Sequence, residues 1–151
     1  MKTEIAQISV VLATIFSTLS FAEENASLPP VKTQGQTQFL SGGIGKDESD
    51  AILQARNSWP LTLELTQLTQ LTEAASPTAE YISDVQIIIK DALGNNVLDT
   101  TTDGPYLLVK LPAGKYSLDA TYNSITLHRN FNLQKAPGKK VALVWPAAKN
   151  D

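Results

Sequence analysis

The sequence predicts a mainly β protein, a seven-stranded antiparallel β-sandwich preceded by one short helix. Three observations lead to this prediction. Apolar residues recur at every second position over most of the chain after residue 60, which is the period of a half-buried strand. Turn-forming segments such as Pro112–Gly114 and Asn123–Ser124 separate these runs at short intervals. One segment before residue 60 has the apolar spacing of a helix instead.

Residues 1–22 have the order of a secretory signal peptide. Lys2 lies near the start, an apolar run covers residues 8–19, and Ser20–Ala22 offers small residues at the cleavage position. The run is shorter than the roughly 20 residues needed to cross a bilayer. We therefore expect a Sec-type signal cleaved after Ala22, and a periplasmic or secreted protein without a stable membrane anchor. An uncleaved anchor is the alternative.

Cleavage there leaves about 130 residues, a length typical of one domain. The polar stretch 23–36, which contains two prolines, predicts a flexible lead-in. Residues 37–60 are expected to form a short strand and a helix that pack on the sandwich. Ala51, Ile52 and Ala55 recur at helical spacing, and the helix should cover 47–58.

Asp47 is expected to cap this helix, because acids in a first turn meet the positive end of the helix dipole. Glu48 and Asp50 follow in the same turn, and Pro60 stops the helix at or before Trp59.

The sandwich is expected over 61–146, with a tail at 147–151 and a polar loop near 73–80. Each run should point one set of residues inward. These sets are Leu61, Leu63 and Leu65; Val85, Ile87 and Ile89; Leu107, Val109 and Leu111; Tyr116, Leu118, Ala120 and Tyr122; Ile125, Leu127, Phe131 and Leu133; and Val141, Leu143 and Trp145, with a further short strand at 97–101.

Arg129 shares the inward parity of its run. We expect it to turn outward at a bulge or at an end of the sandwich; a buried pair with Asp99 or Asp119 is the alternative.

The stretch DGPYLLVKLPAGKYSLDATY, residues 103–122, resembles the central signature of carboxypeptidase regulatory-like, transthyretin-like sandwich domains. SDVQIIIKDALGNNVLDTTTDG, immediately upstream, matches the strand, turn and strand that precede that signature. The wider pattern, with Gly42–Gly45, Asp47–Glu48 and Trp145, is similar to small exported bacterial proteins that join such a segment and helix to the sandwich. The resemblance covers roughly 39–145. It implies a fold and no assigned activity.

The stretch LSGGIGKDE, residues 40–48, raises the possibility of a phosphate loop. A Walker-type loop needs glycine where Leu40 stands and a hydroxyl residue where Asp47 stands, and the acid would repel phosphate. We therefore interpret Gly42–Gly45 as a bend or a close backbone approach at the helix entry, without nucleotide. A weak calcium site at Asp47, Glu48 and Asp50 is the alternative.

Composition excludes several classes of function. The net charge of −3 is not that of a nucleic-acid-binding protein, and Lys135, Lys139, Lys140 and Lys149 are interpreted as solvated turn and tail residues. With no cysteine and one histidine, zinc sites built on several such ligands are excluded. His128 lies on the polar parity of its strand, where a solvent-facing ring is expected. We predict no catalytic, cofactor-binding or metal-binding residues.

Exposed aromatic residues could form a platform for stacking on a carbohydrate. Tyr116, Tyr122 and Trp145 have core parity, whereas Trp59, Tyr81 and Tyr106 are expected to be freer. The first hypothesis is a non-catalytic exported binding or accessory module of the bacterial envelope, whose partner is an unidentified envelope protein or polymer. The alternative is a carbohydrate-binding or carbohydrate-processing protein that uses an unrecognised carboxylate site.

Overall fold

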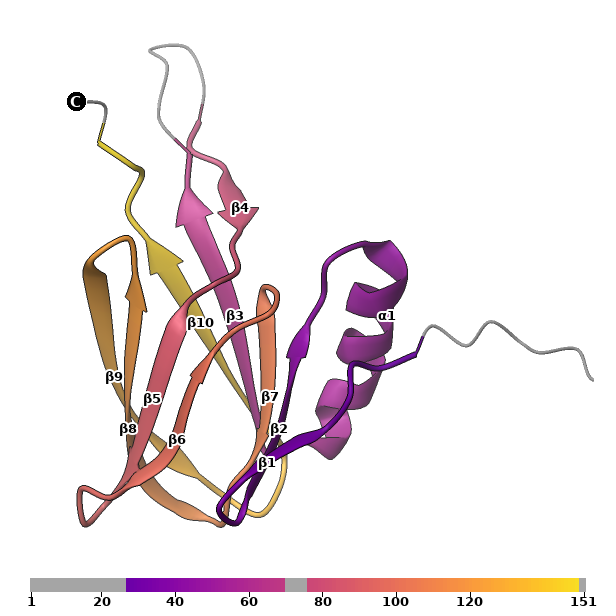
Figure 1. The fold of residues 1–151 in the computed structure, drawn as a ribbon, viewed down its shortest axis with the longest axis vertical. Coiled ribbons are helices and arrows are strands. Elements are labelled where there is room, and N and C mark those ends of the chain that lie inside the picture. The colour runs from indigo at the N-terminus through magenta and orange to yellow at the C-terminus, as the bar shows by residue number, and fades with distance from the viewer. Residues whose placement is uncertain (1–26, 70–75, 150–151) are drawn as a thin grey trace, which may run out of the picture.

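The computed structural model describes residues 27–69 and 76–149 (Figure 1). The expected signal peptide and its cleavage point after Ala22 lie outside the described residues. Within those ranges the chain forms ten strands in two sheets, one α-helix and one short 3-10 helix. The mainly β class is confirmed, and the prediction of seven strands is wrong. No helix in the described ranges is long and apolar enough to cross a membrane.

Sheet A contains six strands. Its main path runs β1 (Lys32–Gln34), β2 (Thr37–Gly42), β7 (Tyr106–Lys110), β3 (Leu61–Leu68) and β10 (Lys139–Trp145), and β4 (Ala79–Tyr81) pairs with the end of β3. Strand β1 lies in the expected lead-in, and β4 begins within the expected polar loop. Strand β10 runs parallel to β3, with Lys139 opposite Leu61 and Trp145 opposite Gln67. The prediction of a purely antiparallel arrangement is therefore wrong.

Sheet B contains four antiparallel strands in the order β6 (Asn96–Thr101), β5 (Gln86–Asp91), β8 (Gly114–Tyr122) and β9 (Ile125–Leu133). Strands β8 and β9 form a hairpin in which Tyr122 pairs with Ile125. The two turn residues have positive φ, 47° at Asn123 and 63° at Ser124. A turn of this kind has the same twist as the two strands that it connects. The turn therefore sets the register of the β8–β9 pair.

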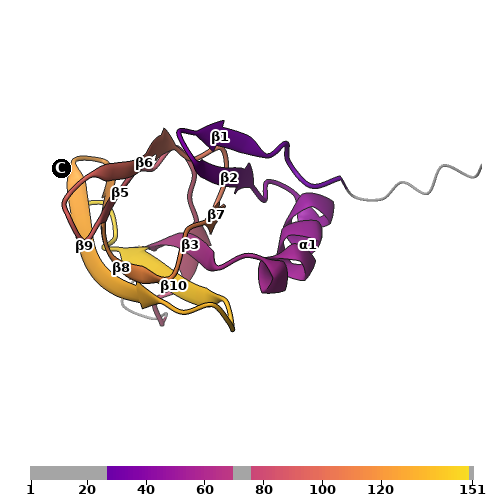
Figure 2. The ribbon, with the colours of Figure 1, turned by 90° about the horizontal axis from the view of Figure 1, so that it is seen from below.

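The main core lies between the two sheets, which face each other in a sandwich-like arrangement (Figure 2). The period-two prediction is confirmed for its central members, because both sheets bury the expected parity; the fully buried side chains include Leu61, Leu63, Leu65, Ile87, Ile89, Leu107, Leu118, Leu143 and Trp145. The indole Nε1 of Trp145 also donates to the Ile125 carbonyl of β9 at 3.0 Å. One side chain thus links the last strand of sheet A to the edge of sheet B.

A second, smaller core lies on the outer face of sheet A, under helix α1 (Lys46–Ala55) and the 3-10 turn η1 (Arg56–Ser58) (Figure 2). Its buried members are Leu40, Ile52, Trp59, Tyr106 and Leu108. Strand β7 is consequently buried on both faces. The expectation that Trp59 and Tyr106 are free is wrong, because α1 covers both of them.

Candidate functional site

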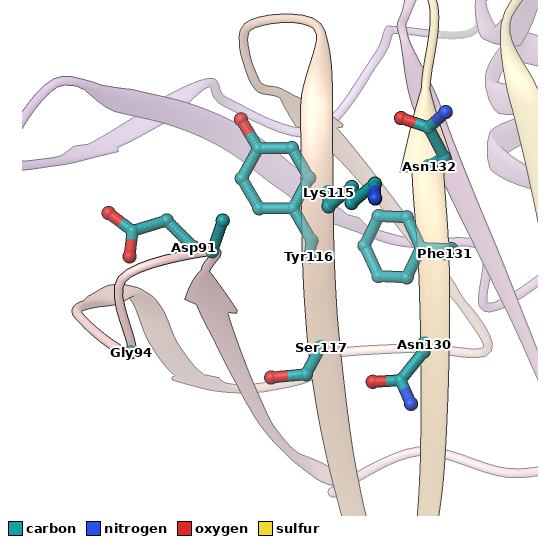
Figure 3. A pocket seen from close by; sticks show the side chains of 9 residues that line it. Asp91, Gly94, Lys115, Tyr116, Ser117, Asn130, Phe131 and Asn132 are labelled. Carbon is teal, nitrogen blue, oxygen red and sulfur yellow. The ribbon is translucent and has the colours of Figure 1, made fainter.

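An open groove of about 680 Å³ lies at one end of sheet B (Figure 3). We call it the sheet B groove. Three segments line it: Asp91, Ala92 and Gly94 from the β5–β6 turn; Lys115, Tyr116 and Ser117 from β8; and Asn130, Phe131 and Asn132 from β9. The β8–β9 register brings the last two segments together, since Ser117 lies opposite Asn130 and Lys115 opposite Asn132.

Two of the lining residues, Tyr116 and Phe131, belong to the main core and expose only 8% and 7% of their surfaces. The rings of Tyr116 and Phe131 stack with centroids 5.7 Å apart and an interplanar angle of 22°. The Tyr116 hydroxyl donates to the Pro112 carbonyl at 2.7 Å. Burial raises the pKa of Tyr116, and the nearby charge of Asp91 raises it further. The Tyr116 ring is held in place by its burial and by the hydrogen bond to Pro112.

Asp91, the one carboxylate that lines the groove, is engaged in building the β5–β6 turn. Its Oδ1 accepts the backbone N–H groups of Leu93 and Asn95, both at 2.9 Å, and its Oδ2 accepts the Asn95 side-chain amide at 3.2 Å. The Asn95 backbone N–H is the main reason why the pKa of Asp91 lies below its usual range. A carboxylate held ionised in this way is a poor general acid.

Apart from Asp91 and Lys115, the polar residues that line the groove are uncharged and can form hydrogen bonds. Asn130 and Asn132 are exposed on the outer face of β9, and Ser117 lies beside them on β8. These residues present amide and hydroxyl groups that can donate and accept. Their role in a groove was not predictable from strand alternation alone. The available signal was two asparagines at alternate positions of one strand, where asparagine is normally depleted.

His128 contacts Asp119 across the same hairpin, with Nδ1 2.6 Å from Oδ1. Both side chains are about half exposed, which confirms the expected solvent-facing ring. A Ser-His-Asp site would also need a serine hydroxyl on the imidazole. Within the described ranges no serine hydrogen-bonds His128, so the structure does not bring a triad together here.

Arg129 is exposed, as expected, although it lies opposite the buried Leu118 in a regular ladder without a bulge. Its Nη1 donates to the His128 carbonyl at 2.8 Å. Strand β9 is the edge of sheet B, so a side chain of inward parity reaches water past that edge. Asp119 contacts His128 instead, and the alternative of a buried pair with Asp99 or Asp119 is wrong.

The Gly42–Gly45 segment has the structural role that the sequence predicts. A Cβ at Gly42 would lie 2.2 Å from Glu48 Oε1, and Gly43 and Gly45 have φ values of 101° and 88°. The prediction that Asp47 caps the helix is wrong, since α1 begins after Gly45 without any side-chain cap. Glu48 accepts the Gly43 N–H at 2.6 Å instead. That this segment binds no nucleotide stays a prediction.

The three acids of the alternative calcium site do not converge. Glu48 is bonded to the Gly43 backbone, whereas Asp50 pairs with Lys46 one turn away. Across residues 27–69 and 76–149, no group of three histidine, cysteine or acidic side chains could hold a metal ion. The calcium alternative therefore has no assembled ligand set.

The aromatic residues do not form a shared platform. Tyr116 and Trp145 are buried and Tyr122 is partly buried against the main core, as expected. Of the three residues expected to be free, Tyr81 alone is exposed, and its ring lies 5.6 Å from the buried ring of Tyr106. Burial raises the pKa of Tyr106, with contributions from Tyr81 and the charge of Glu64. A stacking surface for sugars built on these aromatics is not present in the described chain.

No family model matches the chain, and no curated protein matches it.

Proposed function

We propose that this chain is a non-catalytic binding or accessory module of the bacterial envelope that contacts its partner through the sheet B groove. The observation that supports the proposal is that the Asp91 carboxylate is held ionised by hydrogen bonds. An acid–base site needs a carboxyl group free to exchange a proton with its substrate, whereas Asp91 is held by three hydrogen bonds within its own turn. The remaining rim groups are suited to hydrogen bonding.

Export and the sandwich type belong to the same proposal. The order of charged start, apolar run and small residues in 1–22 supports a cleaved signal and a periplasmic or secreted location. The signature in residues 103–122 supports a carboxypeptidase regulatory-like, transthyretin-like sandwich. The two facing sheets agree with that type of fold, although the number of strands is higher than the resemblance implies.

A carbohydrate ligand is the second candidate, and the rim chemistry favours it. Asn130, Asn132 and Ser117 offer neutral donors and acceptors of the kind that pair with sugar hydroxyls. Carbohydrate processing is less well supported, because the groove offers one carboxylate and cleavage of a glycosidic bond normally uses two.

Retention on envelope material tests binding and catalysis together. The purified mature protein is mixed with isolated envelope polymer, and both the sedimented protein and the released soluble fragments are measured. The proposal predicts retention without release, and weaker retention for the Asn130→Ala/Asn132→Ala double variant than for the control Gln38→Ala on sheet A. Release of fragments above the level of a protein-free sample would contradict the non-catalytic assignment. Equal retention of the two variants would contradict the proposal that the sheet B groove contacts the partner.

A further inference from the structure

Strand β9 is an open edge of sheet B. The sheet ends at β9, and within the described ranges no further strand pairs with it (Figure 1). It has nine residues, whereas β1, β6 and β10, which form the other sheet edges, have three, six and seven. The β6 edge is also partly occupied, because the Gln34 side chain bonds both backbone groups of Asp99. Among the described strands, β9 therefore offers the longest edge to another chain.

The register of the β8–β9 hairpin determines which backbone groups of β9 face outward. In an antiparallel pair, residues that exchange backbone hydrogen bonds alternate with residues whose N–H and C=O groups point away from the partner strand. The two-residue turn closes on the Tyr122–Ile125 pair, and a turn of this kind joins its first and last residues by a hydrogen bond. Counting from this pair, the outward-pointing groups belong to Thr126, His128, Asn130 and Asn132.

The contacts at this edge agree with that count. The Arg129 Nη1 donates at 2.8 Å to the His128 carbonyl, which is one of the outward-pointing groups. The four residues that carry these groups are exposed. The indole of Trp145 contacts the edge at Ile125, one residue before the first of them. A row of donors and acceptors repeated along an extended strand is the pattern that another extended chain satisfies, so this edge fits a polypeptide better than a sugar or an ion.

Side chains of the inward parity indicate which polypeptide fits. In an added antiparallel ladder they occupy the non-hydrogen-bonded positions, where side chains directly opposite each other lie closest. Leu127 is partly buried against the main core and Phe131 is 7% exposed within it, so apolar partners would extend that core. Arg129 lies between them, is exposed and has no ion pair within the described ranges. An acidic partner would match its charge.

A second copy of this chain does not supply the matching charge. Strand β9 contains no acidic residue, so two β9 strands paired with each other would leave Arg129 without a carboxylate opposite it. The complement of β9 is instead a strand with an apolar residue, an acid and another apolar residue at alternate positions. Its carboxylate would also receive the Arg129 guanidinium when the new ladder occupies the His128 carbonyl.

We propose that the β9 edge binds an extended segment of an envelope protein as a fifth, antiparallel strand of sheet B, and that this segment has an acid flanked at the second position on each side by an apolar residue. Every pairing already present in sheet B is antiparallel. The inference rests on the proposed function, because the added strand would lie along the β9 side of the sheet B groove, next to Asn130 and Asn132. It specifies the chemical class of the partner there.

Hydrogen exchange of the mature protein with the blocked peptide Ac-Thr-Val-Thr-Glu-Thr-Val-Thr-NH2 tests the proposal. As the peptide concentration rises to the millimolar range, the amide protons of the four outward-pointing residues should exchange progressively more slowly, because binding protects them. The amide protons of the alternate residues, which already bond β8, should change much less. No slowing, or equal slowing in the two sets, would overturn the proposal.

Two modified peptides locate the contact on the peptide backbone. In the antiparallel ladder the threonine N–H groups face β9 and the valine N–H groups face away from it. N-methylation of the two threonines beside the glutamate should therefore weaken binding by about tenfold or more, since two hydrogen bonds are lost. N-methylation of the two valines is the matched control and should weaken binding much less. Equal effects, or the reverse order, would contradict an antiparallel ladder.

Charge reversal tests the part played by Arg129. Arg129→Glu should weaken binding of the glutamate peptide by about fivefold or more, and should strengthen binding of the same peptide with lysine in place of glutamate. Lys46→Glu, an equal change of charge on an exposed residue of α1, should alter neither affinity. Equal effects of the two variants, or no gain for the lysine peptide, would contradict the acidic position assigned to the partner.

Retention of the same preparation on envelope polymer separates this inference from the proposed function. Retention of the Asn130→Ala/Asn132→Ala variant reports on side chains of the sheet B groove, and equal retention of Gln38→Ala counts against the groove whether or not the peptide binds. The alternating exchange pattern reports on backbone groups of β9. Its absence overturns the inference even when the double variant loses retention.

Discussion

The side-chain amide of Gln34 acts as a strand partner for Asp99. Its Nε2 donates to the Asp99 carbonyl at 2.9 Å, and its Oε1 accepts the Asp99 N–H at 2.6 Å. Asp99 lies on β6, the edge of sheet B, and Gln34 ends β1, the edge of sheet A. One amide thus joins the edges of the two sheets and occupies backbone groups that an exposed edge would offer to another chain.

Gln34→Ala should therefore destabilise the protein by about 1–2 kcal/mol, since two hydrogen bonds of modest net value are lost together. Gln36→Ala, in the adjacent turn, removes an exposed amide that makes no such contact and should change the stability by less than about 0.5 kcal/mol. Chemical denaturation measures both changes. Similar values for the two variants would show that the Gln34 amide does not join the sheets in solution.

The burial patterns of β8 in sheet B and β10 in sheet A predict a sharp contrast between neighbouring positions. Leu118 and Leu143 are fully buried, so Leu118→Ala and Leu143→Ala should each cost roughly 2–5 kcal/mol. Ser117→Ala and Thr121→Ala change residues on the opposite face and should cost less than half as much. The free energy of unfolding in denaturant is the measurement. Equal losses in the two sets would mean that the register is wrong.

The entry to helix α1 distinguishes Glu48 from its acidic neighbour. Glu48→Ala should cost about 1–2 kcal/mol, because the partly buried Gly43 N–H loses its acceptor. Asp47→Ala should cost about 0.3–1 kcal/mol through the helix dipole alone. Lys46→Ala, at an exposed ion pair, should have little effect. Thermal unfolding of the three variants checks this order, and a larger loss for Asp47→Ala than for Glu48→Ala would reverse the assignment.

Much of the fold is predictable from the local pattern, and the failures have physical causes. Alternation correctly predicts that Leu107 and Val109 lie in the main core. Tyr106 and Leu108, at the other parity of the same strand, are also apolar. This continuous run is the signal of a strand covered on both faces, which the prediction of a free Tyr106 overlooked. Strand β1 has no apolar alternation and forms through its pairing with β2. Nothing local to its sequence could reveal that.

The parallel pairing of β10 with β3 and both pockets depend on contacts between distant segments. The sheet B groove joins Asp91 to Asn130 and Asn132, and a second pocket, at the start of β10, is lined by Arg56 and by Lys139 and Lys140. The four lysines near the C-terminus were visible in the sequence as a modest cluster. The arginine that two of them meet in the pocket is more than 80 residues away in the chain. Its place beside them follows from the fold.

The state of Asp91 predicts a pH dependence of stability. The pKa of this carboxyl group is lower in the folded than in the unfolded chain, so its contribution is full above the unfolded pKa and is lost as the pH falls through the folded pKa. Between roughly pH 5 and pH 2 the unmutated protein should therefore lose more stability than Asp91→Asn, whose side chain does not titrate. Denaturation at a series of pH values provides the test. An equal loss of stability in both proteins would contradict the claim that hydrogen bonds in the β5–β6 turn lower the pKa of Asp91.

The central claim is that the sheet B groove is the contact surface, and site-specific crosslinking tests it most directly. The chain has no cysteine, so one introduced thiol carries a short photo-crosslinker at one chosen position. Asn132→Cys places it on the rim of the groove, and Gln38→Cys places it at an exposed position of sheet A. On irradiation of intact cells, we predict a discrete adduct with one envelope component from Asn132→Cys and none from Gln38→Cys. No adduct at Asn132, or the same adduct from both positions, would contradict the claim.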